Sequence, residues 1–226
     1  MNEPLIGVIG YEGGNHQSVG LALAKLGHRS SIVASASEIQ ACDRLILPGV
    51  GSAGATMESL SRTGLCGPMH AAVIERKVPF LGICIGLQLL LDRSEEDDTR
   101  CLGWVAGTVR RFPADRMRVP QIGWNSVEFV AGSPFFGGVP SGEYFYFVNS
   151  YHALVDDDGD VGGWTEYGLR FSSAISRENI VATQFHLEKS GPAGLALLDR
   201  FVKHSFRSAP VSTREAVAQD QPGQAS

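Results

Sequence analysis

Short apolar runs alternate with amphipathic stretches through the first half of the chain. The apolar runs predict buried strands, at residues 5–10, 30–34, 44–47 and 80–83. Apolar residues at helical spacing between these runs predict helices, at residues 18–26, 54–61 and 69–75. Strands that alternate with helices form a parallel sheet with helices on both faces. Catalytic groups in such a fold belong at the carboxyl ends of the strands.

Beyond Gly103 the alternation gives way to strands alone. They are expected at residues 105–112, 127–130, 144–152, 163–167 and 180–185, before a closing helix at 191–206. We therefore expect an α/β domain over residues 1–206, with a mainly parallel central sheet flanked by helices and an additional mixed or antiparallel sheet. Residues 207–226 carry few apolar anchors, which predicts a disordered tail.

Composition excludes several classes of protein. The net charge is −5 and the basic residues are scattered, which argues against a nucleic-acid surface. The four cysteines lack paired or metal-binding spacing, which argues against disulfides and bound metal and fits a reducing compartment. No apolar run reaches the ~18 residues that a membrane span requires. We expect a cytoplasmic protein that needs no metal or other cofactor.

The segment Gly82-Ile83-Cys84-Ile85-Gly86 directly follows the apolar run at 78–81. One cysteine between two glycines after a buried strand is typical of a nucleophile elbow, where a sharp turn into a helix strains the turn residue. Good helix formers at 86–91 would place the Cys84 sulfur at a helix N-terminus, which favours a thiolate. The alternative is a buried structural cysteine.

A thiolate nucleophile needs a base, and the base needs a group that orients it. His186 and Glu188 are the candidate pair. If residues 180–185 form a strand, alternation puts 186 and 188 on the same side, so that the carboxylate can hold the imidazole toward the sulfur. A structural histidine at a strand end is the alternative.

A third element is the glycine-bracketed loop at residues 48–52, which follows the strand at 44–47. Its backbone N–H groups are little obstructed by side chains, so the Gly51 N–H could form an oxyanion hole with the Ile85 N–H. The alternatives are a plain turn or a phosphate-binding loop. The absence of a Gly-Lys-Ser/Thr ending disfavours a nucleotide P-loop.

Five segments, in one order over residues 5–205, together resemble the class I, or triad-type, glutamine amidotransferases. They lie at residues 48–52, 82–88, 120–125, 146–152 and 184–190. Cys84 with Gln88, and His186 two positions before Glu188, resemble the class as a whole. Within the class, residues 123–125 and 146–148 are most similar to the glutaminase subunit of imidazole glycerol phosphate synthase.

The resemblance implies a flavodoxin-like fold and hydrolysis of L-glutamine to glutamate and ammonia by Cys84, His186 and Glu188. The ammonia would pass to a (β/α)₈ cyclase subunit in a heterodimer, which makes imidazole glycerol phosphate and aminoimidazole carboxamide ribotide in histidine biosynthesis. The implied substrate contacts are Gly49, Gln88, Glu96, Ser150 and Tyr151. The implied partner contacts are Asn15, Trp124, Asn125, Tyr146 and Lys189.

The residues themselves leave plainer roles open for some of these positions. Glu96 lies in an acidic run that would ordinarily be a solvated loop, and Lys189 would ordinarily be a solvated charge. Trp124 and Tyr146 could be core aromatics.

The chain departs from the family pattern at four places. Gly10 stands in place of an aspartate and Gln121 in place of a histidine. Leu187 replaces a proline between His186 and Glu188, and Asn149 replaces a residue that is often histidine. The departures at Gly10 and Leu187 keep open a glutaminase for a different synthase, such as a sugar amidotransferase. A second alternative is a non-catalytic glutaminase-like module that binds a partner, which the intact Cys84, His186 and Glu188 disfavour. An ester-cleaving α/β-hydrolase is disfavoured because its acid precedes its histidine.

Overall fold

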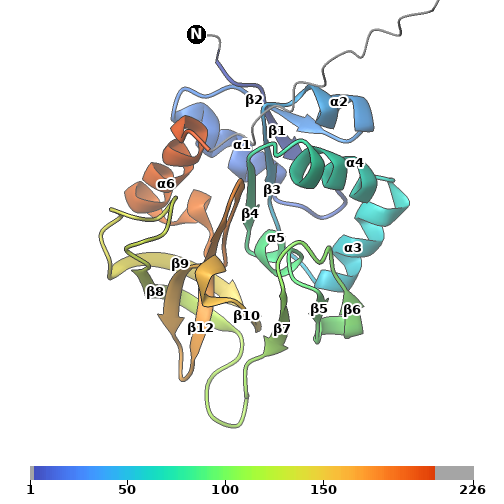
Figure 1. Cartoon of the computed structure of the whole chain (residues 1–226). Helices are drawn as coiled ribbons and strands as arrows, with labels where there is room; N and C mark the ends of the chain where they lie inside the picture. The colour runs from blue at the N-terminus through green and yellow to red at the C-terminus, as the bar shows by residue number, and fades with distance from the viewer. Residues whose placement is uncertain (1–2, 207–226) are drawn as a thin grey trace, which may run out of the picture.

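Five parallel strands form one half of the central sheet (Figure 1). The computed structural model describes residues 3–206, so the tail predicted at 207–226 lies outside the described residues. The parallel strands are, in spatial order, β2 (Ser30–Val33), β1 (Ile6–Ile9), β3 (Arg44–Leu47), β4 (Phe80–Ile83) and β13 (Ile180–Thr183). β1, β4 and β13 are buried at every residue, as expected for strands covered on both faces.

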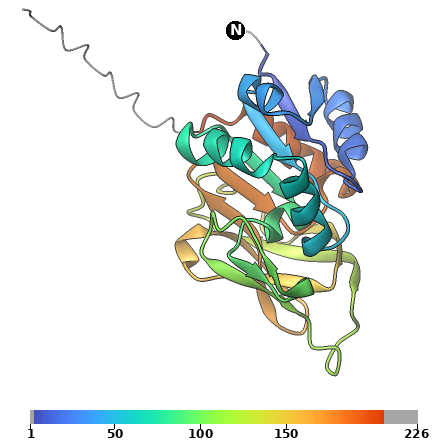
Figure 2. The ribbon, with the colours of Figure 1, turned by 90° about the vertical axis from the view of Figure 1, so that its right-hand side faces the viewer.

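Helices cover the two faces of these strands (Figures 1 and 2). One face carries α1 (His16–Lys25) and α6 (Gly191–Lys203). The other carries α2 (Ala36–Ala41), α3 (Ala53–Arg62) and α4 (Cys66–His70), which continues into a π-helical turn at Ala71–Glu75. Each face has its own apolar core, so alternate side chains of β3 enter different cores, Leu45 and Leu47 on one side and Ile46 on the other.

The second half of the sheet is mixed and joins the first half through the antiparallel pairing of β12 with β13. The remaining path runs through β10, β7, β5 and β6, while β11, β8 and β9 branch from β12. The bounds are Arg93–Ser94 (β5), Thr99–Arg100 (β6), Gly107–Arg111 (β7), Gln121–Phe129 (β8), Glu143–Asn149 (β9), Tyr151–Val155 (β10), Val161–Glu166 (β11) and Arg170–Arg177 (β12). The additional antiparallel strands therefore continue the parallel sheet rather than forming a detached one.

Some elements differ from the sequence prediction. The run at 144–152 is two strands, because the chain breaks at Ser150 between β9 and β10. α2 and β12 were not predicted, and β8 begins six residues before the expected 127. The helix expected over 86–91 is only α5 (Ile85–Gln88), because the carbonyls of residues 89–91 accept backbone N–H groups of residues 102–105 instead.

None of the helices in residues 3–206 has the length and apolar content to cross a membrane.

His152 is a buried titratable group in the mixed half of the sheet. Its ring stacks on Phe112 at 4.5 Å and meets Phe171 edge-on at 5.8 Å between ring centroids. Burial lowers the pKa of His152 to about 4, Glu95 opposes the shift and Arg110 adds to it. The folded pKa therefore lies below the ordinary value of 6.5. The fold therefore favours the neutral ring of His152 over the protonated ring.

This shift predicts a pH-dependent stability. The contribution of neutral His152 is complete above pH ~6.5 and is lost as the pH falls toward about 4, where the loss reaches about 3 kcal/mol of unfolding free energy. Urea unfolding of the wild type and the His152→Phe variant across this range should show the difference. The variant should lose less stability on acidification, and equal slopes of unfolding free energy against pH would contradict the assignment.

Candidate active site

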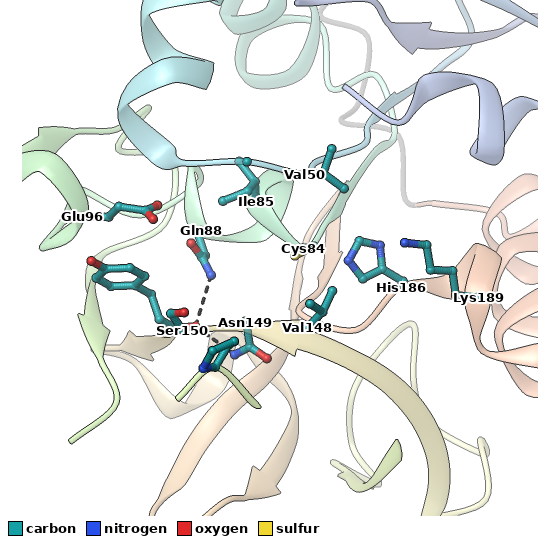
Figure 3. Close-up of a pocket in the computed structure, with 13 residues that line it drawn as sticks. Val50, Cys84, Ile85, Gln88, Glu96, Val148, Asn149, Ser150, His186 and Lys189 are labelled. Atoms are coloured by element: carbon teal, nitrogen blue, oxygen red, sulfur yellow. Dashed lines mark hydrogen bonds between the residues drawn. The ribbon is translucent and has the colours of Figure 1, made fainter. Parts of the chain in front are cut away.

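Cys84 lies at a sharp turn between β4 and α5 (Figure 3). Its φ of 54° is a left-handed conformation that non-glycine residues rarely adopt, as a nucleophile elbow requires. The Cys84 N–H donates to the Thr183 carbonyl at 2.7 Å, which anchors the strained turn to β13. A Cβ at Gly82 would lie 2.5 Å from the Gly86 carbonyl oxygen, so the turn can close only over glycine. The predicted elbow is therefore present.

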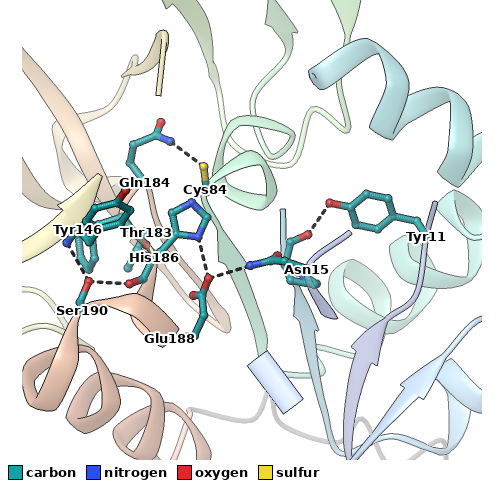
Figure 4. Close-up of polar contacts among 11 residues, drawn as sticks. Tyr11, Asn15, Cys84, Tyr146, Thr183, Gln184, His186, Glu188 and Ser190 are labelled. Carbon is teal, nitrogen blue, oxygen red and sulfur yellow. Dashed lines mark hydrogen bonds and ion pairs between the residues drawn. The ribbon is translucent and has the colours of Figure 1, made fainter. Parts of the chain in front are cut away.

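His186 and Glu188 meet beside Cys84 (Figure 4). His186 is fully buried and follows β13, while Glu188 lies in the 3₁₀ turn Leu187–Lys189. His186 Nδ1 and Glu188 Oε1 are 2.8 Å apart, and Asn15 Nδ2 donates to the same oxygen at 2.8 Å. Asn15, implied as a partner contact, thus fixes the carboxylate inside this chain. The Leu187 side chain, where the family has proline, is buried in the core on the α1 and α6 face.

The charge of His186 follows from its neighbours. Burial lowers the pKa of His186, but interaction with Cys84 and then with Glu188 outweighs burial and raises the pKa to about 10. His186 Nε2 makes no hydrogen bond within the described residues, so it is available to exchange a proton with Cys84. An imidazolium against the sulfur favours the thiolate. The four-residue α5 aligns few peptide dipoles, so the thiolate depends on these side chains more than on the helix.

The glycine loop at residues 48–52 lies against the elbow. A Cβ at Gly49 would be 2.5 Å from the Ile85 Cβ, so only glycine allows the loop to approach the residue after the nucleophile. Gly51 has a φ of +100°. Val50, Gly51 and Ile85 line the same pocket as Cys84. Gly51 and Ile85, the two residues expected to form an oxyanion hole, therefore lie at the same cavity as Cys84.

Tyr11 holds this loop from behind. Its hydroxyl donates to the Pro48 carbonyl at 2.8 Å and is buried. Burial raises the pKa of Tyr11 to about 12, against the opposing effects of the Val50 N–H and the Thr56 hydroxyl. Sequence reasoning missed this role, because nothing in the order of residues links position 11 to position 48.

Tyr11→Phe should therefore loosen the loop without altering the pocket lining. Removing the hydroxyl leaves the buried Pro48 carbonyl unpaired, which should cost about 1–2 kcal/mol of unfolding free energy. We expect kcat for glutamine hydrolysis to fall more than KM rises. Tyr167→Phe is the matched control, since its hydroxyl donates to the exposed Arg118 carbonyl at 2.8 Å. Equal losses of stability in urea unfolding of the two variants would contradict the special role of Tyr11.

A cavity of about 400 Å³ opens in front of Cys84 (Figure 3). Four of the five predicted substrate contacts line it, namely Gln88, Glu96, Ser150 and Tyr151. Gly49, the fifth, does not line the cavity and instead packs against Ile85. The buried Gln88 Oε1 has no hydrogen-bond partner among the described residues, so it can accept from a substrate N–H. The cavity has polar residues at both ends, and its volume suits a small amino acid.

Glu96 lies at the far end of this cavity from His186 (Figure 3). The Ala53 N–H at the start of α3 donates to Glu96 Oε2 at 2.7 Å, which orients the carboxylate. Burial raises the pKa of Glu96, with the Ala53 N–H opposing the shift. A cationic amino group would offset that burial, as a substrate α-amino group can.

The predicted partner contacts are divided between two places. Trp124 and Tyr146 pair across β8 and β9 with ring centroids 6.2 Å apart. Trp124 is 55% exposed, so it is not the core aromatic that was the alternative. Asn125 donates to the Glu166 carbonyl at 2.9 Å, and Lys189 lines the cavity.

The same face of the β8–β9 hairpin carries two residues that sequence reasoning missed. Ile122 is 62% exposed and Tyr144 is 60% exposed. Side chains two apart on a strand share a face, so these residues extend the surface of Trp124 and Tyr146, and Phe145 and Phe147 enter the core on the other side. We call Ile122, Trp124, Tyr144 and Tyr146 the aromatic face.

Comparison with known proteins places the chain. Residues 8–205 match the family described as glutamine amidotransferase class-I. The chain is similar to imidazole glycerol phosphate synthase subunit HisH of Herpetosiphon aurantiacus, with 46% identity over 200 residues that cover 88% of this chain and 94% of that protein. It is also 43% identical to the protein of that name from Methanocaldococcus jannaschii, over 88% of this chain and 99% of that one.

Solved structures agree at the level of the fold. One titled "Structure of PurLQS from Thermotoga maritima" has a TM-score of 0.69 at 18% identity and covers 89% of this chain and 99% of that one. Another, titled "Crystal structure of glutamine amidotransferase", has a TM-score of 0.67 at 19% identity, over 87% and 98% of the two chains. The chain therefore belongs to the class-I glutamine amidotransferase family and, within it, to the HisH subunits of imidazole glycerol phosphate synthase.

Proposed function

We propose that this chain is the glutaminase subunit of an imidazole glycerol phosphate synthase and that Cys84, His186 and Glu188 are its catalytic residues. The observation that carries the proposal is the meeting of a strained cysteine, a buried histidine–carboxylate pair and a glycine loop at one cavity. Each group of the triad has the neighbour that its role requires.

The arrangement supports the following reaction. The Cys84 thiolate attacks the side-chain amide carbon of glutamine, and the backbone N–H groups of Gly51 and Ile85 stabilise the oxyanion. The His186 imidazolium gives its proton to the leaving nitrogen, so that ammonia departs and a glutamyl thioester remains on Cys84. His186 then takes a proton from water, which attacks the thioester and releases glutamate. Side chains, backbone N–H groups and water supply every group, so we propose no cofactor.

The ammonia must reach a second active site. At neutral pH free ammonia is mostly protonated and is then no nucleophile, so direct transfer preserves its reactivity. The relatives are named as subunits, and the aromatic face offers a surface for a partner. This face lies near Lys189, because the Tyr146 N–H donates to the hydroxyl of the next residue, Ser190, at 2.9 Å. We propose that a (β/α)₈ cyclase docks on this face and receives the ammonia. A cytoplasmic heterodimer fits the four free cysteines.

A single charge on the aromatic face should disrupt the complex. Trp124→Glu removes a large exposed aromatic and places an anion in the proposed contact, which should weaken binding of the cyclase by at least about thirtyfold. Titration calorimetry with a histidine-pathway cyclase measures the dissociation constant. Leu21→Glu is the matched control, because Leu21 is 72% exposed on α1, away from the hairpin. Equal binding of the cyclase to both variants would contradict the docking site.

Labelling tests the glutaminase site itself. A glutamine-like electrophile should modify Cys84 selectively over Cys42, Cys66 and Cys101, and peptide mass spectrometry identifies the labelled residue. Failure to label Cys84 would favour the non-catalytic module. Labelling of Cys84 together with binding to a sugar-modifying enzyme and not to a cyclase would favour the alternative synthase.

A further inference from the structure

Gln184 is a fully buried polar side chain next to the Cys84 sulfur (Figure 4). Its Nε2 lies 3.5 Å from Cys84 Sγ in hydrogen-bonding geometry. The reaction described above gives Gln184 no role. Burying an amide costs free energy unless its polar atoms are hydrogen-bonded, and here the sulfur accepts a hydrogen bond from the Gln184 amide.

The orientation of the Gln184 amide is fixed from its other end. Gln88 Nε2 donates to Gln184 Oε1 at 3.0 Å and to the Tyr151 carbonyl at 3.2 Å. A reversed Gln184 amide would set its NH₂ group against that of Gln88 and its carbonyl against the sulfur, so both contacts would be lost. The backbone N–H of Gln184 donates to the Ser173 carbonyl at 2.8 Å, which holds the residue at the end of β13.

We propose that Gln184 is a catalytic residue that donates a hydrogen bond to the Cys84 thiolate. The proposal rests on the assignment of Cys84 as the nucleophile. An N–H donor on the side of the sulfur away from His186 stabilises the thiolate and not the thiol, because a neutral thiol accepts hydrogen bonds weakly. The same donor stabilises Cys84 as the leaving group when water cleaves the thioester. Short α5 supplies little of this stabilisation, as described above.

The hydrogen bonds that join Tyr151, Gln88, Gln184 and Cys84 also link the sulfur to the substrate cavity. Gln88 and Tyr151 line the cavity, and Gln88 orients the Gln184 amide that contacts the sulfur. A substrate that hydrogen-bonds the free Gln88 Oε1 therefore contacts the residue that positions the donor to the thiolate. Gln88 would therefore both bind glutamine and position the amide that stabilises the Cys84 thiolate.

The test is the pH dependence of Cys84 alkylation by iodoacetamide in the full chain, for the wild type and Gln184→Met. Methionine has a similar length but no N–H donor, so the midpoint of the alkylation rate should move up by about one pH unit or more. In the cyclase complex, kcat for glutamine should fall at least about tenfold with a smaller change in KM. Gln121→Met is the matched control, since Gln121 is a buried amide without a hydrogen-bond partner among the described residues.

Each outcome separates this proposal from the assignment of the nucleophile. If wild-type Cys84 titrates like an ordinary thiol, the triad assignment fails. If wild-type Cys84 is activated but Gln184→Met keeps its midpoint and kcat, the role of Gln184 is overturned. Side-chain amide NMR of the unsubstituted chain decides the matter even if Gln184→Met does not fold. The Gln184 Nε2 protons should shift with the same midpoint as the alkylation rate, and protons that do not respond to pH would overturn the proposal.

Discussion

Replacing Cys84 by alanine should abolish glutamine-dependent synthesis of imidazole glycerol phosphate by the complex. The nucleophile acts together with His186 and the oxyanion donors, so its loss removes covalent catalysis as a whole, and a reduction of at least about 10⁴-fold is expected. Ammonia-dependent synthesis by the cyclase should be unchanged, because that reaction bypasses the glutaminase site. Both rates can be measured on one preparation, with glutamine or an ammonium salt as the nitrogen source.

Cys101→Ala is the matched control for Cys84→Ala. Cys101 is also buried, and burial raises the pKa of its thiol to about 11, so it remains protonated and unreactive. The control should retain glutamine-dependent synthesis. Loss of both the glutamine- and ammonia-dependent rates in Cys84→Ala would mean that Cys84 is structural. Retention of both would mean that another residue is the nucleophile.

Gly86→Ala should have the largest effect on stability. A Cβ at this position would lie 2.2 Å from the Leu47 carbonyl oxygen, and backbone atoms of β3 cannot move aside as a flexible side chain does. We expect the free energy of unfolding to fall by about 3 kcal/mol or more. Because Gly86 belongs to the turn that presents Cys84, the surviving folded protein should also hydrolyse glutamine poorly. Urea unfolding and a glutaminase assay with the cyclase measure the two effects.

The control for Gly86→Ala is the same substitution at a helical position that has space for a methyl group. Gly20 lies in α1, where the nearest heavy atom to a new Cβ is the Ser30 hydroxyl oxygen at 3.8 Å. Gly20→Ala should stabilise the protein by about 0.5–1 kcal/mol, through helix propensity and a less flexible unfolded chain. A Gly86→Ala variant as stable as wild type would contradict the close packing of the elbow on β3.

The parallel half of the fold could be read from the sequence because its signals are local. Buried strands such as β1 and β4 are continuous apolar runs, and the intervening helices have helical spacing. The helix after Cys84 was predicted too long because residues 89–91 are strong helix formers. Tertiary contacts with residues 102–105 override that preference. β12 was missed because serines at 172 and 173, both buried and on opposite faces of the strand, interrupt its apolar run.

The residues of the site also divide into those with a local sequence signal and those placed by long-range contacts. Cys84 was found because the elbow is a short-range pattern. His186 and Glu188 were the correct pair, but the strand alternation expected for them was wrong, because β13 ends at Thr183 and Leu187–Lys189 form a 3₁₀ turn. Tyr11 and Asn15 contact residues 37 and 173 positions away, which no local pattern encodes. Gln184 did have a signal, because it directly follows the end of β13, two positions before His186. Its side chain donates a hydrogen bond to the Cys84 sulfur.

The most direct test of the account is glutamine hydrolysis by the purified chain, first alone and then with a histidine-pathway cyclase and its ribotide ligand. We predict a low rate for the isolated chain and strong stimulation by the liganded cyclase, with one imidazole glycerol phosphate formed for each glutamine hydrolysed. A rate that is already high alone would contradict control by the partner. No stimulation, with Cys84 still open to labelling, would contradict the assignment of the cyclase and point to a different synthase.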